Sequence, residues 1–203
     1  MTSIDPAHIL QQYYPPGSAS YDLLVRHGEQ VAHKALSIAN RLRDRTVDQT
    51  FLYEAAMLHD IGIFLTDTPT LGCHGDQPYI RHGILGRALL ETHGLDRHAL
   101  VCERHVGVGL SANDIRHQQL PLPRRDMLPL TVEEEIICYA DKFFSKKGGA
   151  PCSRTIPEIF DTLRPYGEVP VLRFQAWVRR FENGCRPPTA PRETGKSACI
   201  LRD

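Results

Sequence analysis

Histidine and aspartate residues recur at positions that would face the interior of helical segments, where a buried metal site takes its ligands. The chain contains ten histidines. In a helix, residues three, four or seven positions apart share a face. By this rule His27 lies in the apolar stripe of Leu24 and Val31, and His59 lies seven residues after Leu52. Both histidines are therefore expected to point into a core.

Four more polar residues occupy apolar faces by the same spacing, and they are Asp60, His82, His105 and Asp141. Burying an ionised carboxylate costs several kcal/mol unless the group is paired or bound to a metal. Imidazoles and carboxylates are ligands that suit Fe, Mn, Co or Zn. Because six ligands exceed what one tetrahedral site needs, we expect two ions a few ångströms apart, with one aspartate bridging them.

A plainer interpretation stays open at this point. An inward histidine is usually a hydrogen-bonded core residue, and a buried aspartate can pair with a nearby cation. The candidate cations are Arg26, Arg81, Arg104 and Lys142. His98 shares a helix face with His105 and is therefore a rival ligand.

The elements that must position these residues are predicted to be helices. Capping residues and apolar periodicity predict helices over about 20–43, 46–61, 78–94, 97–106, 131–149, 156–164 and 167–182, with a short one after Ser111. The first begins at Ser20, and the second begins with the capping-box pattern of Thr46 and Gln49. The proline-rich residues 119–129 predict a loop, and strand signals are nearly absent. The expected fold class is all-α, with six to eight helices.

Length and composition favour a single domain with a sizeable core, because the 203 residues are 41% apolar. We expect an irregular lead-in at 1–19, a domain over 20–183 and a flexible tail at 184–203. The 24 Lys and Arg residues balance the 24 Asp and Glu residues. This balance argues against binding nucleic acid through a broad basic face.

The expected location is the cytoplasm. No signal peptide is visible at the N-terminus, and no apolar run approaches the roughly 18 residues that a membrane span needs. The six cysteines are scattered, so they are interpreted as reduced thiols and not as a disulfide or zinc framework. The expected partners therefore include neither a membrane nor a nucleic acid.

Three segments resemble the HD-domain metal-dependent phosphohydrolases. RHGEQVAHKALSIA around His27 is similar to the family's first-ligand helix, and EAAMLHDIG is similar to its HD helix. YADK around Asp141 is similar to its last-ligand helix. The resemblance covers about residues 20–148 and implies an HD-domain helical bundle.

The order His, His-Asp, His, His, Asp resembles the dinuclear branch of this superfamily, which includes cyclic-dinucleotide phosphodiesterases, diadenosine tetraphosphate hydrolases and diiron oxygenases. YIRHGILGRALLETHGL is similar to the third-ligand region of several of these groups. The resemblance implies that Asp60 bridges two ions and that His82 and His105 bind the second one. HVGVGLSA stands in place of the Gly-Tyr-Pro signature of the HD-GYP class, and Ile63 stands in place of its usual Lys. A cyclic-di-GMP phosphodiesterase is therefore not expected.

The resemblance implies hydrolysis of a small phosphate ester or anhydride, with a nucleotide as the expected substrate, through a metal-bridging hydroxide. The cofactors would be two divalent transition-metal ions, Fe or Mn first, with Zn, Co, Ni or Mg as alternatives. Asp60 and Lys142 are the expected catalytic residues. Arg81, Arg104 and Lys146 are the candidate substrate-binding cations.

Other functions stay open on the same residues. A mixed-valent diiron oxygenase uses the same His and Asp ligands, so ligand identity does not separate it from a hydrolase. A degenerate HD fold could serve as a non-enzymatic binding module. Trp177, Val178 and Phe181 lie on or near an apolar face of the last predicted helix, which either packs on the core or supports a homodimer.

Overall fold

The computed structural model describes residues 3–42, 47–146 and 152–182, and helices account for most of them. The α-helices are α1 (Pro6–Gln11), α2 (Ala19–Leu42), α3 (Gln49–Leu58), α4 (His82–Thr92), α5 (Asp96–Arg104), α6 (Ala112–His117), α7 (Val132–Asp141), α8 (Ile156–Leu163) and α9 (Glu168–Phe181). None of the described helices is long and apolar enough to cross a membrane. This content confirms the all-α fold class.

Short elements connect the α-helices. The 3-10 helices are η1 (Ile61–Leu65), η2 (Pro69–Leu71), η3 (Tyr79–Arg81) and η4 (Arg164–Tyr166). Two-residue strands form antiparallel pairs, β1 (Asp67–Thr68) with β2 (Cys73–His74) and β3 (Phe144–Ser145) with β4 (Cys152–Ser153). Both pairs belong to connections between helices, and both lie close to the site described below.

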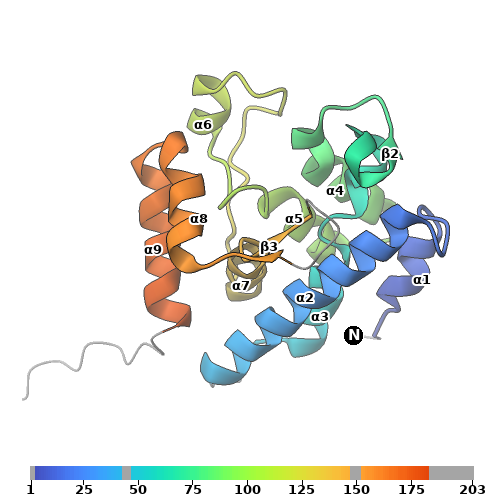
Figure 1. Ribbon diagram of the computed structural model, residues 1–203, viewed down its shortest axis with the longest axis horizontal. Coiled ribbons are helices and arrows are strands. Elements are labelled where there is room, and N and C mark those ends of the chain that lie inside the picture. The colour runs from blue at the N-terminus through green and yellow to red at the C-terminus, as the bar shows by residue number, and fades with distance from the viewer. Residues whose placement is uncertain (1–2, 43–46, 147–151, 183–203) are drawn as a thin grey trace, which may run out of the picture.

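The core consists of two apolar clusters. One joins α2, α3, α7, α8 and α9, and the other joins α1, the start of α2, η1, α4 and α5. Figure 1 shows α8 and α9 at one end of the molecule and α1 at the other, with the long helix α2 running between them. The chain passes from the first cluster at Ala56 to the second at Leu58 and Ile61, so His59 and Asp60 lie where the two clusters meet.

The N-terminal residues contain a helix that the sequence analysis did not predict. Asp5 caps α1, because its carboxylate accepts hydrogen bonds from two backbone N–H groups. Ile9 and Leu10 of this helix are buried in the second cluster. The expectation of an irregular lead-in was wrong for residues 6–11, because a helix this short offers too few residues to show a periodicity.

Two helix boundaries also differ from the prediction. The carboxylate of Asp48 caps α3 by accepting a hydrogen bond from the backbone N–H of Phe51, while the predicted cap Thr46 lies outside the described residues. The helix predicted over 131–149 ends at Asp141. It stops there because β3 pairs with β4, and Arg154 N donates to Phe143 O across that pair. Residues 147–149 and the tail at 184–203 lie outside the described residues.

The last helix packs on the core. Trp177 and Phe181 are 4% and 0% exposed, and Val178 packs against the same cluster. Core packing, one of the two uses predicted for this face, is therefore confirmed, and the homodimer stays a prediction.

Candidate metal centre

Six buried polar side chains meet where the two apolar clusters join. His27 comes from α2, His59 and Asp60 directly follow α3, His82 begins α4, His105 directly follows α5, and Asp141 ends α7. None of the six residues is more than 6% exposed. They are the residues that helical spacing predicted to face inward together.

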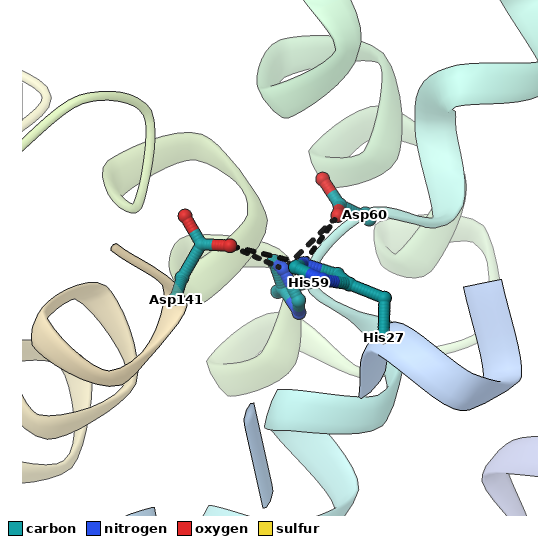
Figure 2. A group of neighbouring side chains, drawn as sticks. All are labelled: His27, His59, Asp60 and Asp141. Atoms are coloured by element: carbon teal, nitrogen blue, oxygen red, sulfur yellow. Dashed lines mark hydrogen bonds and ion pairs between the residues drawn. The ribbon is translucent and has the colours of Figure 1, made fainter. Parts of the chain in front are cut away.

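The first group contains His27, His59, Asp60 and Asp141 (Figure 2). His27 Nε2 lies 3.0 Å from Asp141 Oδ1 and 3.3 Å from Asp60 Oδ2. His59 Nε2 lies 3.1 Å and 3.5 Å from the same two oxygens. One ligand atom from each residue lies within 4.8 Å of all the others. These atoms are close enough to share one ion.

Asp60 also belongs to a second group. Its other oxygen, Oδ1, lies 3.4 Å from His82 Nε2 and 3.4 Å from His105 Nε2. The two nitrogens are 3.1 Å apart. Each oxygen of Asp60 therefore faces a different pair of histidines, which is the arrangement that a bridging carboxylate requires.

Backbone carbonyls determine which ring nitrogen of the second group carries a proton. His82 Nδ1 lies 2.7 Å from Tyr79 O, and His105 Nδ1 lies 2.8 Å from Cys102 O. A carbonyl oxygen only accepts, so each Nδ1 donates its proton there. Burial lowers the pKa of His82 to about 3 and also lowers the pKa of His105, so both rings are neutral at pH 7. Their Nε2 lone pairs and Asp60 Oδ1 then meet with no proton between them, and this donor set fits a cation.

The first group also contains buried polar atoms that lack hydrogen-bond partners. His27 Nδ1, His59 Nε2 and both carboxylate oxygens of Asp60 are buried and take part in no hydrogen bond of normal geometry among the described residues. Buried polar groups are normally hydrogen-bonded. Imidazole nitrogen and carboxylate oxygen are the ligand atoms of Fe, Mn, Co and Zn sites, so the residues present fit a divalent metal ion.

Protons and lysines supply positive charge to this cluster. Burial by itself lowers the pKa of His59, but the Asp60 and Asp141 carboxylates outweigh that effect and raise it to about 9. Burial would raise the pKa of Asp60, but the positive charges of His59 and Lys146 hold it well below its usual range. Lys142 and Lys146 likewise outweigh burial and hold the pKa of Asp141 well below its usual range. Both aspartates are therefore ionised at neutral pH.

A pocket of about 400 Å³ opens beside the cluster and includes His82, His105 and Asp141 in its lining. The cations along it are Lys142, Lys146 and Arg154, and its short hydroxyl side chains are Thr68, Thr70 and Ser145. Lys142 Nζ lies 2.8 Å from Asp141 Oδ2, and Lys146 Nζ lies 2.7 Å from Asp60 Oδ2. An anionic ligand in this pocket would lie beside His82, His105 and Asp141 of the cluster and beside the three cationic side chains.

Comparison with known sequences identifies the family to which the chain belongs. A sequence model of the HD domain matches residues 24–145, a range that contains all six cluster residues. The chain belongs to the HD-domain family. Together with the buried His and Asp cluster, this membership indicates a divalent-metal site and, more broadly, a metal-dependent hydrolase.

The chain is similar to parts of longer proteins. It is 33% identical over 125 residues to a tRNA (cytidine(56)-2'-O)-methyltransferase of Picrophilus torridus, which is 61% of this chain and 32% of that protein. A protein of the same name from Thermoplasma volcanium is 30% identical over 142 residues, 70% of this chain and 37% of that protein. The chain therefore spans about a third of each of these two relatives.

A third relative is an uncharacterized protein of Methanocaldococcus jannaschii. It is 34% identical over 121 residues, which is 58% of this chain and 64% of that protein. No solved structure matches the chain.

Of the three predicted substrate-binding cations, one lines the pocket and two do not. Lys146 lines the pocket, and it reaches Asp60 from the position directly after β3 and not from a continued helix. Arg104 does not line the pocket, because its guanidinium binds the Glu134 carboxylate at 2.8 and 3.0 Å. Arg81 is also absent from the lining, and its Nε is buried without a hydrogen-bond partner among the described residues.

Two other residues complete the comparison with the sequence analysis. Arg154 lines the pocket and was missed, because it follows the predicted helix and only the β3–β4 pairing brings it back. His98, the rival ligand, lies outside both groups, and its Nε2 is 3.2 Å from Glu54 Oε2. Helical periodicity does not predict that Arg154 lines the pocket, and it does not predict that His98 lies outside the cluster.

Glycines let the ligand-bearing backbones approach one another. A Cβ on Gly62 would lie 2.3 Å from His82 O, and a Cβ on Gly83 would lie 2.6 Å from Cys102 O. A side chain at either position would push these segments apart. The glycines therefore hold the turn after Asp60 against the start of α4, and α4 against α5.

Proposed function

We propose that this HD domain is a metal-dependent phosphohydrolase that acts on a small phosphate ester or anhydride, with a nucleotide as the expected substrate. The observation that carries the proposal is the division of Asp60 between two histidine pairs beside a cationic pocket. We propose two divalent ions, one held by His27, His59, Asp60 and Asp141 and the other by Asp60, His82 and His105. Fe and Mn are the first candidates.

The residues of the centre have separable tasks in this reaction. When bound, the ions would supply a water activated at neutral pH and would offset charge on the phosphoryl oxygens. Asp60 holds the two ligand groups at a fixed separation, because its two oxygens belong to one rigid carboxylate. Lys142 and Lys146 add positive charge beside the reacting phosphate. Hydrolysis joins the water oxygen to phosphorus, breaks the bond to the leaving oxygen, and returns a proton to that oxygen.

The names of two relatives make RNA a second substrate class to examine. Both are called tRNA methyltransferases, and the part that matches this chain is about a third of each protein. The neutral overall charge led to the expectation that nucleic acid is not a partner, and an RNA 5′- or 3′-phosphate presents the same phosphate chemistry at a chain end. We therefore place phosphorylated oligoribonucleotides beside free nucleotides in the test.

The test measures metal content and phosphate release on the same protein. Chain purified without chelator, and then loaded with Mn²⁺ or Fe²⁺, is assayed against nucleoside mono-, di- and triphosphates, p-nitrophenyl phosphate and phosphorylated oligoribonucleotides. We expect about two metal equivalents per chain and metal-dependent phosphate release. Lys142→Ala should keep the metals and lower the rate about 10- to 100-fold.

Three results would overturn the proposal. A metal-loaded chain that releases phosphate from none of these compounds is not a phosphohydrolase of this class. Oxygen consumption by the iron form with a diol or hydroxyphosphonate, together with an unpaired-spin signal in the half-reduced state, would assign it to the diiron oxygenases. A well-folded chain that binds no metal would be a binding module.

A further inference from the structure

The three cations of the pocket differ in what they already bind. Lys146 and Lys142 form ion pairs with Asp60 and Asp141. Arg154 forms no ion pair within 4.0 Å with a carboxylate of the described residues. It interacts with the exposed Glu158 only electrostatically, over a longer distance. Arg154 is therefore the pocket cation whose charge is available to a ligand.

Backbone pairing holds Arg154 at the pocket. Its N–H donates to Phe143 O at 2.6 Å, immediately beyond the β3–β4 pair. Its Nη1 also lies 3.4 Å from Lys142 O. Both contacts are to the segment that directly follows Asp141. The guanidinium is therefore positioned relative to a metal-ligand residue and not on an independent loop.

Another part of the pocket lining is aromatic and apolar. Tyr79 is 39% exposed, and its ring centroid lies 4.7 Å from that of His82. Leu71 lines the same pocket. An exposed ring of this kind can stack on a planar ligand group. The volume of about 400 Å³ lies at the small end of the range for small-molecule pockets, so it suits one compact ligand.

Resting on the function proposed above, we propose that Arg154 binds the phosphate group of the substrate and that a planar organic group of the substrate lies against Tyr79. A guanidinium presents paired N–H donors that match two phosphate oxygens, which an ammonium cannot do. The substrate class is then a small phosphomonoester with an aromatic group. Arg154 lies beyond residues 24–145, the range that matches the HD domain.

Binding of compounds that cannot be hydrolysed tests the two contacts separately. The Mn²⁺-loaded full chain is titrated calorimetrically with inorganic phosphate, methylphosphonate and phenylphosphonate. Arg154→Gln should weaken phosphate binding about 10- to 100-fold at unchanged metal content, and Arg154→Lys should recover part of the loss. Tyr79→Ala should remove the advantage of phenylphosphonate over methylphosphonate and leave phosphate binding within about twofold.

Arg164→Gln is the matched control, because Arg164 is an exposed arginine that pairs with Asp161 and does not line the pocket. Its phosphate affinity should equal that of the wild type. Phosphate binding that is the same in Arg154→Gln as in the wild type would overturn the assignment of Arg154. Equal wild-type affinities for the two phosphonates would overturn the assignment of Tyr79.

The outcomes also separate this inference from the proposed function. Phosphate release that persists while binding is independent of Arg154 would refute only the inference. Arg154-dependent phosphate binding without release from any ester would support the anion site and refute the phosphohydrolase. Metal content and thermal unfolding of Arg154→Gln and Arg154→Lys show whether either variant has lost its fold.

Discussion

Asp60 and Glu103 are equally buried carboxylates, each 3% exposed, but their surroundings differ. Glu103 Oε1 accepts from Arg125 Nε at 3.1 Å, and its other oxygen pairs with Arg87. Asp60 has a nitrogen of each of four histidines within 3.4 Å, and one ammonium, Lys146 Nζ, lies 2.7 Å from its Oδ2. Its Oδ1 faces the neutral rings of His82 and His105 and has no hydrogen-bond partner among the described residues. Guanidinium groups satisfy the first carboxylate, whereas the second lies among groups that a cation would satisfy.

The difference shows that burial of a charge does not identify a functional site by itself. Glu103 lies two residues before His105, one of the histidines beside Asp60, so the C-terminal end of α5 contributes to both environments. What separates them is the chemistry of the partners. Arginine is always protonated, so its N–H groups donate hydrogen bonds to a buried carboxylate and satisfy it. An imidazole nitrogen donates a hydrogen bond when it is protonated and can bind a metal ion when it is not.

The largest expected effect is at Asp60. Asp60→Ala should remove both metal equivalents and reduce phosphate release to below about 1% of wild type, because both groups lose their shared ligand. Metal analysis and a phosphate-release assay on the purified variant measure this. Glu103→Gln is the matched control and should keep full metal content. Normal metal content and activity in Asp60→Ala would mean that the site is misassigned.

The two ligand groups should separate in the next pair of variants. His82→Ala and His105→Ala each remove a ligand of the second group only, so the chain should retain about one metal equivalent instead of two. The measurement is metal per chain after desalting. One equivalent in the wild type, unchanged in both variants, would make the centre mononuclear and return His82 and His105 to substrate contacts.

Removing the metal should leave the fold intact. Lys142 and Lys146 already pair with the two aspartates, so the metal-free cluster is not left with uncompensated charge. Chelation should therefore preserve the helical circular dichroism signal while lowering stability by up to about 4 kcal/mol, the value for a ligand at a thousand times its Kd. Thermal unfolding with and without chelator measures the shift. Loss of helical signal on chelation would show that the lysines do not substitute for the ions.

Glu103 should affect stability and not chemistry. Glu103→Gln weakens two guanidinium contacts, and because Arg87 and Arg125 can reach solvent, the loss should be about 1–3 kcal/mol. Urea unfolding measures it. A fall in metal content larger than that of the Arg164→Gln control would contradict the separation between the two carboxylates.

Helical periodicity was sufficient to predict the fold class and the six polar residues that meet. It succeeded because each of the six residues lies in or directly beside a helix whose apolar face points to the core. It failed for α1, which is too short to show a period, and for Arg154, which the β3–β4 pair returns to the pocket. A contact between residues that follow a helix end depends on where the chain turns, and apolar spacing carries no information about that turn.

Substitution of Arg104 should have the smallest effect of these variants. Unlike substitution of Arg154, it should leave phosphate affinity unchanged. The sequence placed Arg104 beside a ligand and predicted a substrate contact, but the structure pairs it with Glu134, which also accepts a hydrogen bond from Leu130 N. Arg104→Gln should lower stability by about 1 kcal/mol and leave phosphate affinity unchanged, as calorimetric titration would show. If phosphate binding instead weakened as far as in Arg154→Gln, the Glu134 pair would have to open when substrate binds, and the sequence-based prediction would be right.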